Sequence, residues 1–311
     1  MEIGEKGLIK YANNTRARVS CLLDVNSGFI LTSRIEKKKI SEITLALNHL
    51  ENLKNKFDLK RLITIYDRGY DSIELMATTE NYGSKYLIRL KKSTFKNQIN
   101  KLNSNDGIIE INSTNARLKS IRDKKLREKL RNKNERFKIR IKKVKLKTGK
   151  TKILATNLTQ EKFSIIELKE LYSKRWAIET GYDKLKNLIQ IEEFSGNREF
   201  IIKQDFYARI FTYNFSTAIQ IDSQKRITRK TRDKNQTIFY NANFSKITGL
   251  IYLYFYDLLT QKPTKRKKTL NFIIKNSNKL ITQENLNKNR KKERKPPDVN
   301  NKHPGNKKRT H

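Results

Sequence analysis

The stretch Leu62-Ile63-Thr64-Ile65-Tyr66-Asp67-Arg68-Gly69-Tyr70 decides the fold class of this chain. Its first five residues are apolar or β-branched, which is typical of a short buried strand. The strand ends before Asp67, and Gly69 permits a tight turn directly after it. Open α/β sheets place functional groups just past the carboxyl end of a strand. An ordinary turn aspartate gives the same pattern, so Asp67 alone does not identify a site.

The segments on both sides of this strand alternate between strand and helix patterns. Such alternation predicts an α/β fold with a sheet that is at least partly parallel. The predicted elements are a β-hairpin (17–24 and 29–35), a helix capped by Ser41, a helix capped by Ser72 and a strand at 86–88.

The composition changes between Lys91 and Lys150, where Lys and Arg number 21 and Asp and Glu number 5. Apolar residues alternate with basic ones from Phe137 to Leu146, as in antiparallel strands with one charged face. We interpret this stretch as an inserted, basic, β-rich subdomain. A further strand is expected over 152–158.

From Ser164 the pattern is helical. We expect one long amphipathic helix from Ile165 to about residue 191, a second over 201–221 and a third over 247–259. The last part, Asn285 to His311, has ten basic residues, two acidic residues and three prolines. It cannot bury enough apolar surface to repay its ordering entropy, which predicts a disordered basic tail.

The overall charge limits the classes of function. The chain has 311 residues and a formal net charge of +39. A surplus this large favours a polyanion partner such as nucleic acid, although an AT-rich genome also enriches Lys. The single cysteine, Cys21, excludes a disulfide scaffold. The most apolar stretch, 249–259, is too short for a membrane span, which needs about 20 residues. With no signal-peptide pattern, these features indicate a cytoplasmic protein without a membrane partner.

Four polar residues recur along the predicted helix: Tyr172, Arg175, Glu179 and Lys186. At about 100° per residue they fall within a stripe roughly 60° wide, and a separate apolar stripe can dock on a sheet. The polar stripe would then lie at the edge of that contact, with Glu179 semi-buried among cations. An ordinary helix with an ion pair between Arg175 and Glu179 gives the same spacing.

These residues resemble the Y-(2)-R-(3)-E-(6)-K signature of DDE-type insertion-sequence transposases of the IS-four family. Asp67-Arg68-Gly69-Tyr70 resembles the strand-end motif around the second catalytic Asp of that family. Two more segments, 194–196 and 204–207, resemble the part that follows its Glu helix. The resemblance runs from about residue 17 to about residue 243.

The resemblance implies a ribonuclease-H-like catalytic domain, with the basic stretch 91–150 as its β-rich insertion. It implies metal-dependent DNA strand cleavage and strand transfer in DNA transposition, with three carboxylates and two Mg²⁺ (or Mn²⁺) ions. Asp67 and Glu179 would be catalytic residues and metal ligands. Tyr172, Arg175 and Lys186 would bind DNA phosphates near the cleavage site.

The resemblance also implies the partners of the chain. They are double-stranded DNA at transposon ends and, on that DNA, a second copy of the chain as a homodimer. The implied location is the cytoplasm of a bacterial cell, with association with the nucleoid while DNA is bound.

The first catalytic Asp of the family has no counterpart that we recognise. Asp24 lies in the predicted hairpin, and Met1 to Tyr11 contain no strand pattern that ends in Asp. We therefore expect a transposase domain that is truncated at its N-terminus, lacks its first strand and is inactive alone. Two alternatives stay open: an active enzyme in which Asp24 supplies the first carboxylate, and a non-enzymatic basic DNA-binding protein.

The expected organisation has five parts. They are the first part of the ribonuclease-H-like domain (1–90), the basic β-rich insertion (91–150), the completion of the catalytic domain with the Glu helix (151–222), a C-terminal helical region (223–284) and the disordered basic tail (285–311).

The only tryptophan, Trp176, lies roughly 140° round the predicted helix from the apolar stripe. It could stack on DNA or pack under the insertion. Packing is favoured because large aromatic side chains are highly buried on average.

Overall fold

The computed structural model describes residues 17–112, 116–119, 121–132, 137–145, 149, 151–231 and 238–285. These residues form two compact units. The first unit comprises 18–25 and 31–179, and the second comprises Ala17, 26–30 and the residues from 180 onward. The division falls inside helix α7 (Trp176–Asn187). The expectations for Met1 to Tyr11 and for residues 286–311 lie outside the described residues.

The first unit is built around a sheet of five strands in the order β3-β4-β7-β6-β5. β3 and β4 are parallel, and the remaining pairs are antiparallel. The expectation of an α/β fold with a partly parallel sheet is therefore confirmed. The strands of this sheet are β3 (Ile63–Tyr66), β4 (Lys85–Arg89), β5 (Asp106–Ile111), β6 (Phe137–Lys145) and β7 (Thr151–Thr156).

The basic stretch 91–150 contributes two of these strands, β5 and β6, to the same sheet as β3 and β4. Strand β7 joins these two strands to β3 and β4, because it pairs with β4 on one side and with β6 on the other. The predicted domain boundaries stay predictions.

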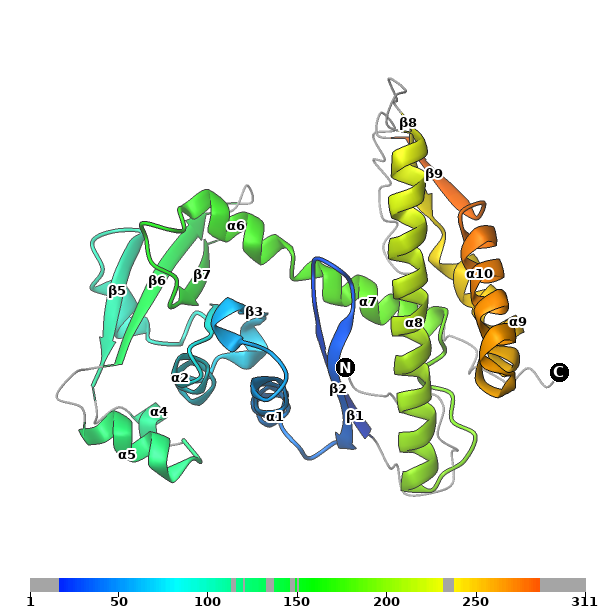
Figure 1. Cartoon of the computed structure of the whole chain (residues 1–311). Helices are drawn as coiled ribbons and strands as arrows, with labels where there is room; N and C mark the ends of the chain where they lie inside the picture. The colour runs from blue at the N-terminus through cyan, green and yellow to red at the C-terminus, as the bar shows by residue number, and fades with distance from the viewer. Residues whose placement is uncertain are drawn as a thin grey trace, which may run out of the picture. The chain divides into compact units, whose positions relative to one another are not determined.

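Helices cover both faces of the sheet (Figure 1). They are α1 (Glu42–Lys54), α2 (Ile73–Asn81), α3 (Lys96–Asn100), α4 (Ala116–Lys119), α5 (Lys124–Asn132) and α6 (Ile165–Ser173). The remaining elements are a two-stranded hairpin of β1 (Ala17–Leu23) and β2 (Ile30–Lys37) and two short 3₁₀ helices (Leu59–Arg61 and Arg68–Tyr70).

Strand alternation assigns residues to the two faces. Tyr66 and Ile88 belong to the larger core, together with Leu50 of α1 and Met76 of α2. The other face carries Leu87 of β4 and Leu154 of β7, which pack against Leu168 and Tyr172 of α6. Ile65 of β3 also packs on this side, so the face that it shares with Leu87 is the one that α6 covers.

Serine caps start three of the helices as the sequence indicates. Ser41 accepts a hydrogen bond from the Thr44 amide at 3.1 Å, and Ser72 accepts one from the Leu75 amide at 3.4 Å. Ser164 and Glu167 form a reciprocal capping box at the start of α6. The predicted starts of these helices are confirmed.

The predicted antiparallel strands with one charged face are present, and this face is buried at Arg140 and Lys142. Both belong to β6, and they are only 7% and 8% exposed. Asp106 of β5 neutralises them: it accepts two bonds from Arg140 at 2.8 Å and one from Lys142 at 2.9 Å. A strand position that alternates with apolar residues therefore need not face water, since a carboxylate on the next strand can pair with it.

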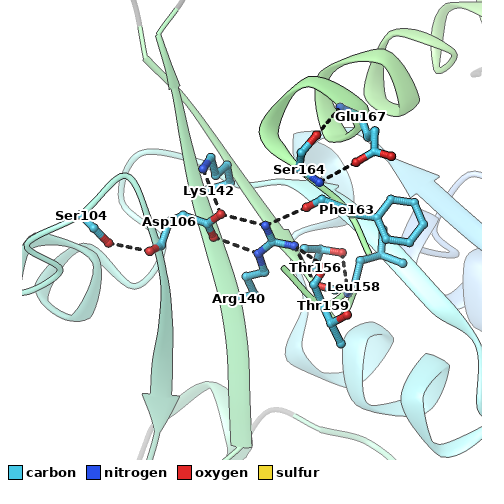
Figure 2. Close-up of polar contacts among 10 residues, drawn as sticks. All are labelled: Ser104, Asp106, Arg140, Lys142, Thr156, Leu158, Thr159, Phe163, Ser164 and Glu167. Atoms are coloured by element: carbon cyan, nitrogen blue, oxygen red, sulfur yellow. Dashed lines mark hydrogen bonds and ion pairs between the residues drawn. The ribbon is translucent and has the colours of Figure 1, made fainter. Parts of the chain in front are cut away.

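Arg140 also fixes the chain that leads into α6 (Figure 2). Its guanidinium donates to the carbonyl oxygens of Leu158, Thr159 and Phe163 at distances of 2.9–3.0 Å. Ser164, the cap of α6, follows directly.

The expectation of one continuous helix over 165–191 is wrong. The structure contains two helices, α6 and α7, with a break at Lys174 and Arg175. In the break, the amides of Arg175 and Ala177 bond to carbonyls three residues earlier, at 3.2 and 2.9 Å. These are 3₁₀-type bonds, which tighten the turn and interrupt the regular α-helical ladder. The single polar stripe is therefore divided between two helices.

The second unit contains three helices, α8 (Glu199–Thr231), α9 (Phe244–Thr260) and α10 (Pro263–Ser277), beside the later part of α7. Their shared core includes Ile219, Ile247, Ile251 and Ile273. Two strands, β8 (Ile238–Ala242) and β9 (Ile281–Asn285), pair antiparallel. The region 223–284 thus contains strands as well as helices.

None of the helices in the described residues is long and apolar enough to cross a bilayer.

Candidate functional site

Asp67 stands at the carboxyl end of β3, where the sequence predicts a functional group. Its Oδ1 accepts a hydrogen bond from the Arg68 amide at 2.7 Å and so caps the short 3₁₀ helix that follows. Since β3 and β4 are parallel, their carboxyl ends meet at the same edge of the sheet. Asp67 continues the alternation of Ile63 and Ile65, which places it on the face that α6 covers.

Helix α6 brings Tyr172 to Asp67. Leu168 and Tyr172 anchor this helix on Leu87 and Leu154 of the sheet. The Tyr172 hydroxyl then donates a hydrogen bond to Asp67 Oδ1 at 3.4 Å. Burial raises the pKa of Tyr172, and the nearby negative charge of Asp67 raises it further. Tyr172 therefore keeps its proton and remains a hydrogen-bond donor.

Arg175 bonds to Glu179, and its charge interacts with that of Asp67. Its Nη1 donates to Glu179 Oε1 at 2.8 Å. Burial lowers the pKa of the guanidinium, but the bond to Glu179 and the charge of Asp67 outweigh burial, so that the pKa of Arg175 is raised. Its side chain is 16% exposed, whereas that of Glu179 is 46% exposed. Asp67, Tyr172, Arg175 and Glu179 thus form one interacting group in the first unit.

Lys186 belongs to the second unit. Its Nζ pairs with Glu192 Oε1 at 3.0 Å. The structure therefore places four of the five predicted site residues together in the first unit and gives the fifth an ion pair in the second.

Trp176 follows Arg175 at the start of α7 and is 62% exposed. The Arg175 guanidinium lies 5.2 Å from the centre of its ring, within cation–π range. The favoured packing role for Trp176 is therefore wrong, since most of its indole faces solvent beside the site.

Two further cations near Tyr172 were missed by the sequence analysis. Arg89 ends β4, and its charge opposes the rise in the pKa of Tyr172. Lys152, at the start of β7, has its Nζ 5.6 Å from the centre of the Tyr172 ring. Arg89 could have been found from the sequence, because it ends the strand that follows Asp67 in the chain. Lys152 has no such signal, because its place depends on the antiparallel pairing of β7 with β4.

The group offers oxygen donors of the kind that a divalent cation needs. Asp67 and Glu179 supply carboxylate oxygens, and Mg²⁺ binds proteins through one or two carboxylates together with water and phosphate oxygens. The described residues contain no group of three or more His, Cys, Asp and Glu side chains that could hold a metal ion. Carboxylate oxygens of this kind suit a cation whose other ligands are water or phosphate.

The family model described as "Transposase DDE domain" matches residues 8–215. That range contains Asp67, Tyr172, Arg175, Glu179 and Lys186.

A curated relative is the transposase InsG for insertion sequence element IS4 from Escherichia coli (strain K12). It is 24% identical over 204 residues, which make up 64% of this chain. The chain spans 43% of the length of that relative.

Among solved structures, the chain is similar to a piggyBac transposase in a synaptic complex with hairpin DNA. The match has a TM-score of 0.46 and 11% sequence identity, and it covers 88% of this chain and 55% of that one.

Proposed function

Because the chain belongs to the family of transposase DDE domains, we propose that it supplies two carboxylates, Asp67 and Glu179, for metal-dependent cleavage and transfer of DNA strands. The observation that carries this proposal is the group formed by Asp67, Tyr172, Arg175 and Glu179. It lies where parallel strands end, the place at which α/β sheets hold their functional groups.

We also propose that the first unit is a ribonuclease-H-like domain. A mixed sheet with one parallel pair and helices on both faces supports this assignment.

A role is proposed for each residue of the group and for Lys186. Asp67 and Glu179 would hold Mg²⁺ (or Mn²⁺), which when bound activates a water or a 3′-hydroxyl and stabilises the leaving oxygen. Tyr172 orients Asp67 through its hydroxyl. Arg175 holds Glu179 and would bind a phosphate oxygen through its remaining donors. Lys186 would bind a second phosphate as a point charge.

The number of carboxylates bears on activity. Two metal ions need several oxygen ligands each, and the family mechanism uses three carboxylates. We therefore propose that this chain is inactive alone and that a third carboxylate completes the site. Asp24 would be the source if the chain is active by itself.

The test uses purified protein and DNA duplexes tiled across the sequence that flanks the gene, with Mg²⁺ or Mn²⁺. We expect no cleavage by the chain alone, and cleavage when a segment that bears the third carboxylate is fused to it. Asp67→Ala should abolish that cleavage, whereas Glu128→Gln, an exposed carboxylate on α5, should not affect it. Cleavage by a fused Asp67→Ala protein at the unmodified rate would overturn the proposal.

A non-enzymatic role in DNA binding is the second candidate, and the net charge of +39 favours it. In that case DNA would bind tightly while no form of the protein cleaves it. A homodimer on DNA is part of the proposed function, and light scattering with and without duplex DNA tests it.

A further inference from the structure

Arg89 and Lys152 extend the α6-facing side of the sheet beyond its apolar part. Leu87 and Leu154 on this side pack against α6. Arg89 lies two positions after Leu87 and directly opposite Leu154, and Lys152 lies two positions before Leu154. Since side chains alternate along a strand, both cations share the face of these leucines and lie at the edge where Asp67 stands.

Neither cation is paired with a carboxylate in the part of the chain that the structure describes. Arg89 and Lys152 form no salt bridge with any residue that the structure describes, although both are partly buried. Their neighbours on β6 behave differently, because Arg140 and Lys142 share the carboxylate of Asp106. Partly buried cations without a carboxylate are costly unless an anion completes their environment.

Arg175 adds an unused donor on the same side. Its Nη1 is taken by Glu179, but its Nε is buried and has no hydrogen-bond partner among the described residues. A buried donor without a partner destabilises the protein, so an incoming acceptor is favoured there. Arg89, Lys152 and Arg175 together carry three positive charges beside the two negative charges of Asp67 and Glu179.

We propose that Arg89, Lys152 and the Nε of Arg175 form a binding site for one phosphodiester group of DNA. This inference rests on the proposed function and adds two residues to it. A phosphate group supplies the acceptor oxygens that the two guanidinium groups and the ammonium lack. The three cations also offset the repulsion between that phosphate and the carboxylates of Asp67 and Glu179. Arg89 and Lys152 are therefore positioning residues that hold the DNA strand against the site.

The experiment measures binding of a random-sequence DNA duplex as a function of salt concentration, by fluorescence anisotropy. Arg89→Gln and Lys152→Gln are compared with Arg61→Gln and Lys125→Gln, which remove exposed cations from the opposite end of β3 and from α5. Each removed phosphate contact should reduce the slope of log affinity against log salt by about 0.9 and weaken binding about five- to tenfold at low salt. The charge-conserving Arg89→Lys should retain most of the slope.

The inference is overturned if Arg89→Gln and Lys152→Gln bind DNA with the same slope and affinity as the two control variants. Should a variant fail to fold, acetylation of the unmodified protein replaces it: DNA should protect Lys152 and leave Lys125 reactive, and equal reactivity of Lys152 with and without DNA overturns the inference.

Mn²⁺ binding separates this inference from the proposed function. If Asp67→Asn leaves Mn²⁺ binding intact while Arg89→Gln weakens DNA binding, the proposed metal site fails and the phosphate site stands. If Asp67→Asn abolishes Mn²⁺ binding while the Arg89 and Lys152 variants match their controls, the proposed function stands and the phosphate site fails.

Discussion

Replacing Arg140 with Met should destabilise the first unit more than any surface substitution. The substitution leaves Asp106, which is 11% exposed, with Lys142 as its one cationic partner among the described residues. It also removes the donor from the carbonyls of Leu158, Thr159 and Phe163. Breaking a buried ion pair from one side costs about 3–5 kcal/mol. Because Lys142 still compensates Asp106 in part, we expect the free energy of unfolding to fall by about 3 kcal/mol. This is a large fraction of the total free energy of unfolding of a typical protein, about 5–15 kcal/mol.

Urea unfolding followed by circular dichroism measures this loss, with Arg61→Met as the matched control at an exposed site. The control should change stability by less than about 0.5 kcal/mol. Hydrogen exchange locates the effect: amides of the segment 158–168 should exchange faster in Arg140→Met, since that segment loses its anchor ahead of α6. A loss below about 1 kcal/mol would show that the buried cluster does not hold this segment.

The same cluster predicts a dependence on pH. The hydrogen bond from Arg140 lowers the pKa of Asp106, and this outweighs burial, which raises it. The stabilisation is therefore present above the pKa of an unfolded Asp, about 3.9, and is lost as pH falls through the lower pKa of the folded state. Arg140→Met should lose less stability than the unmodified protein over that acidic range.

Three further predictions concern other parts of the molecule. Burial, followed by the charge of Arg34, lowers the pKa of His49 from 6.5 to about 4. Folding stability should therefore be complete above pH 6.5 and fall by about 3 kcal/mol as pH approaches 4, and urea unfolding of His49→Gln should lack this fall. Because Trp176 is 62% exposed, Trp176→Ala should change the free energy of unfolding by less than about 0.5 kcal/mol. For the same reason, acrylamide should quench the fluorescence of Trp176 strongly. A loss of unfolding free energy above about 2 kcal/mol would restore a packing role. Deleting 286–311, with its ten basic residues, should weaken DNA binding equally across sequences and reduce its salt dependence, and a sequence-selective loss in anisotropy titrations would contradict this.

The elements that the sequence predicts well are those with local signals. The apolar run before Asp67 predicts β3, and the caps Ser41, Ser72 and Ser164 predict the starts of three helices. The helical spacing of Tyr172, Arg175 and Glu179 marked them as a group, their roles came from the resemblance, and Arg175 bonds to Glu179 in the structure.

The features that the sequence analysis missed depend on contacts between distant residues. The break at Lys174 and Arg175 contains neither Gly nor Pro, so no local signal marks it. The burial of Arg140 depends on Asp106, which lies 34 positions earlier in the chain. Strand β9 lies at the end of a stretch rich in charge that was predicted to be helical, and its pairing with β8 overrides composition. Lys152 reaches Tyr172 only because β7 runs antiparallel to β4.

The most direct test of the central claim, that Asp67 and Glu179 serve one metal ion, is a double-mutant cycle of Mn²⁺ affinity measured by calorimetry. The four proteins are the unmodified chain, Asp67→Asn, Glu179→Gln and the double variant. If both carboxylates bind the same ion, each single variant weakens Mn²⁺ binding and the two effects couple by at least about 0.5 kcal/mol. Effects that add independently, or Mn²⁺ binding that neither substitution changes, would contradict the claim.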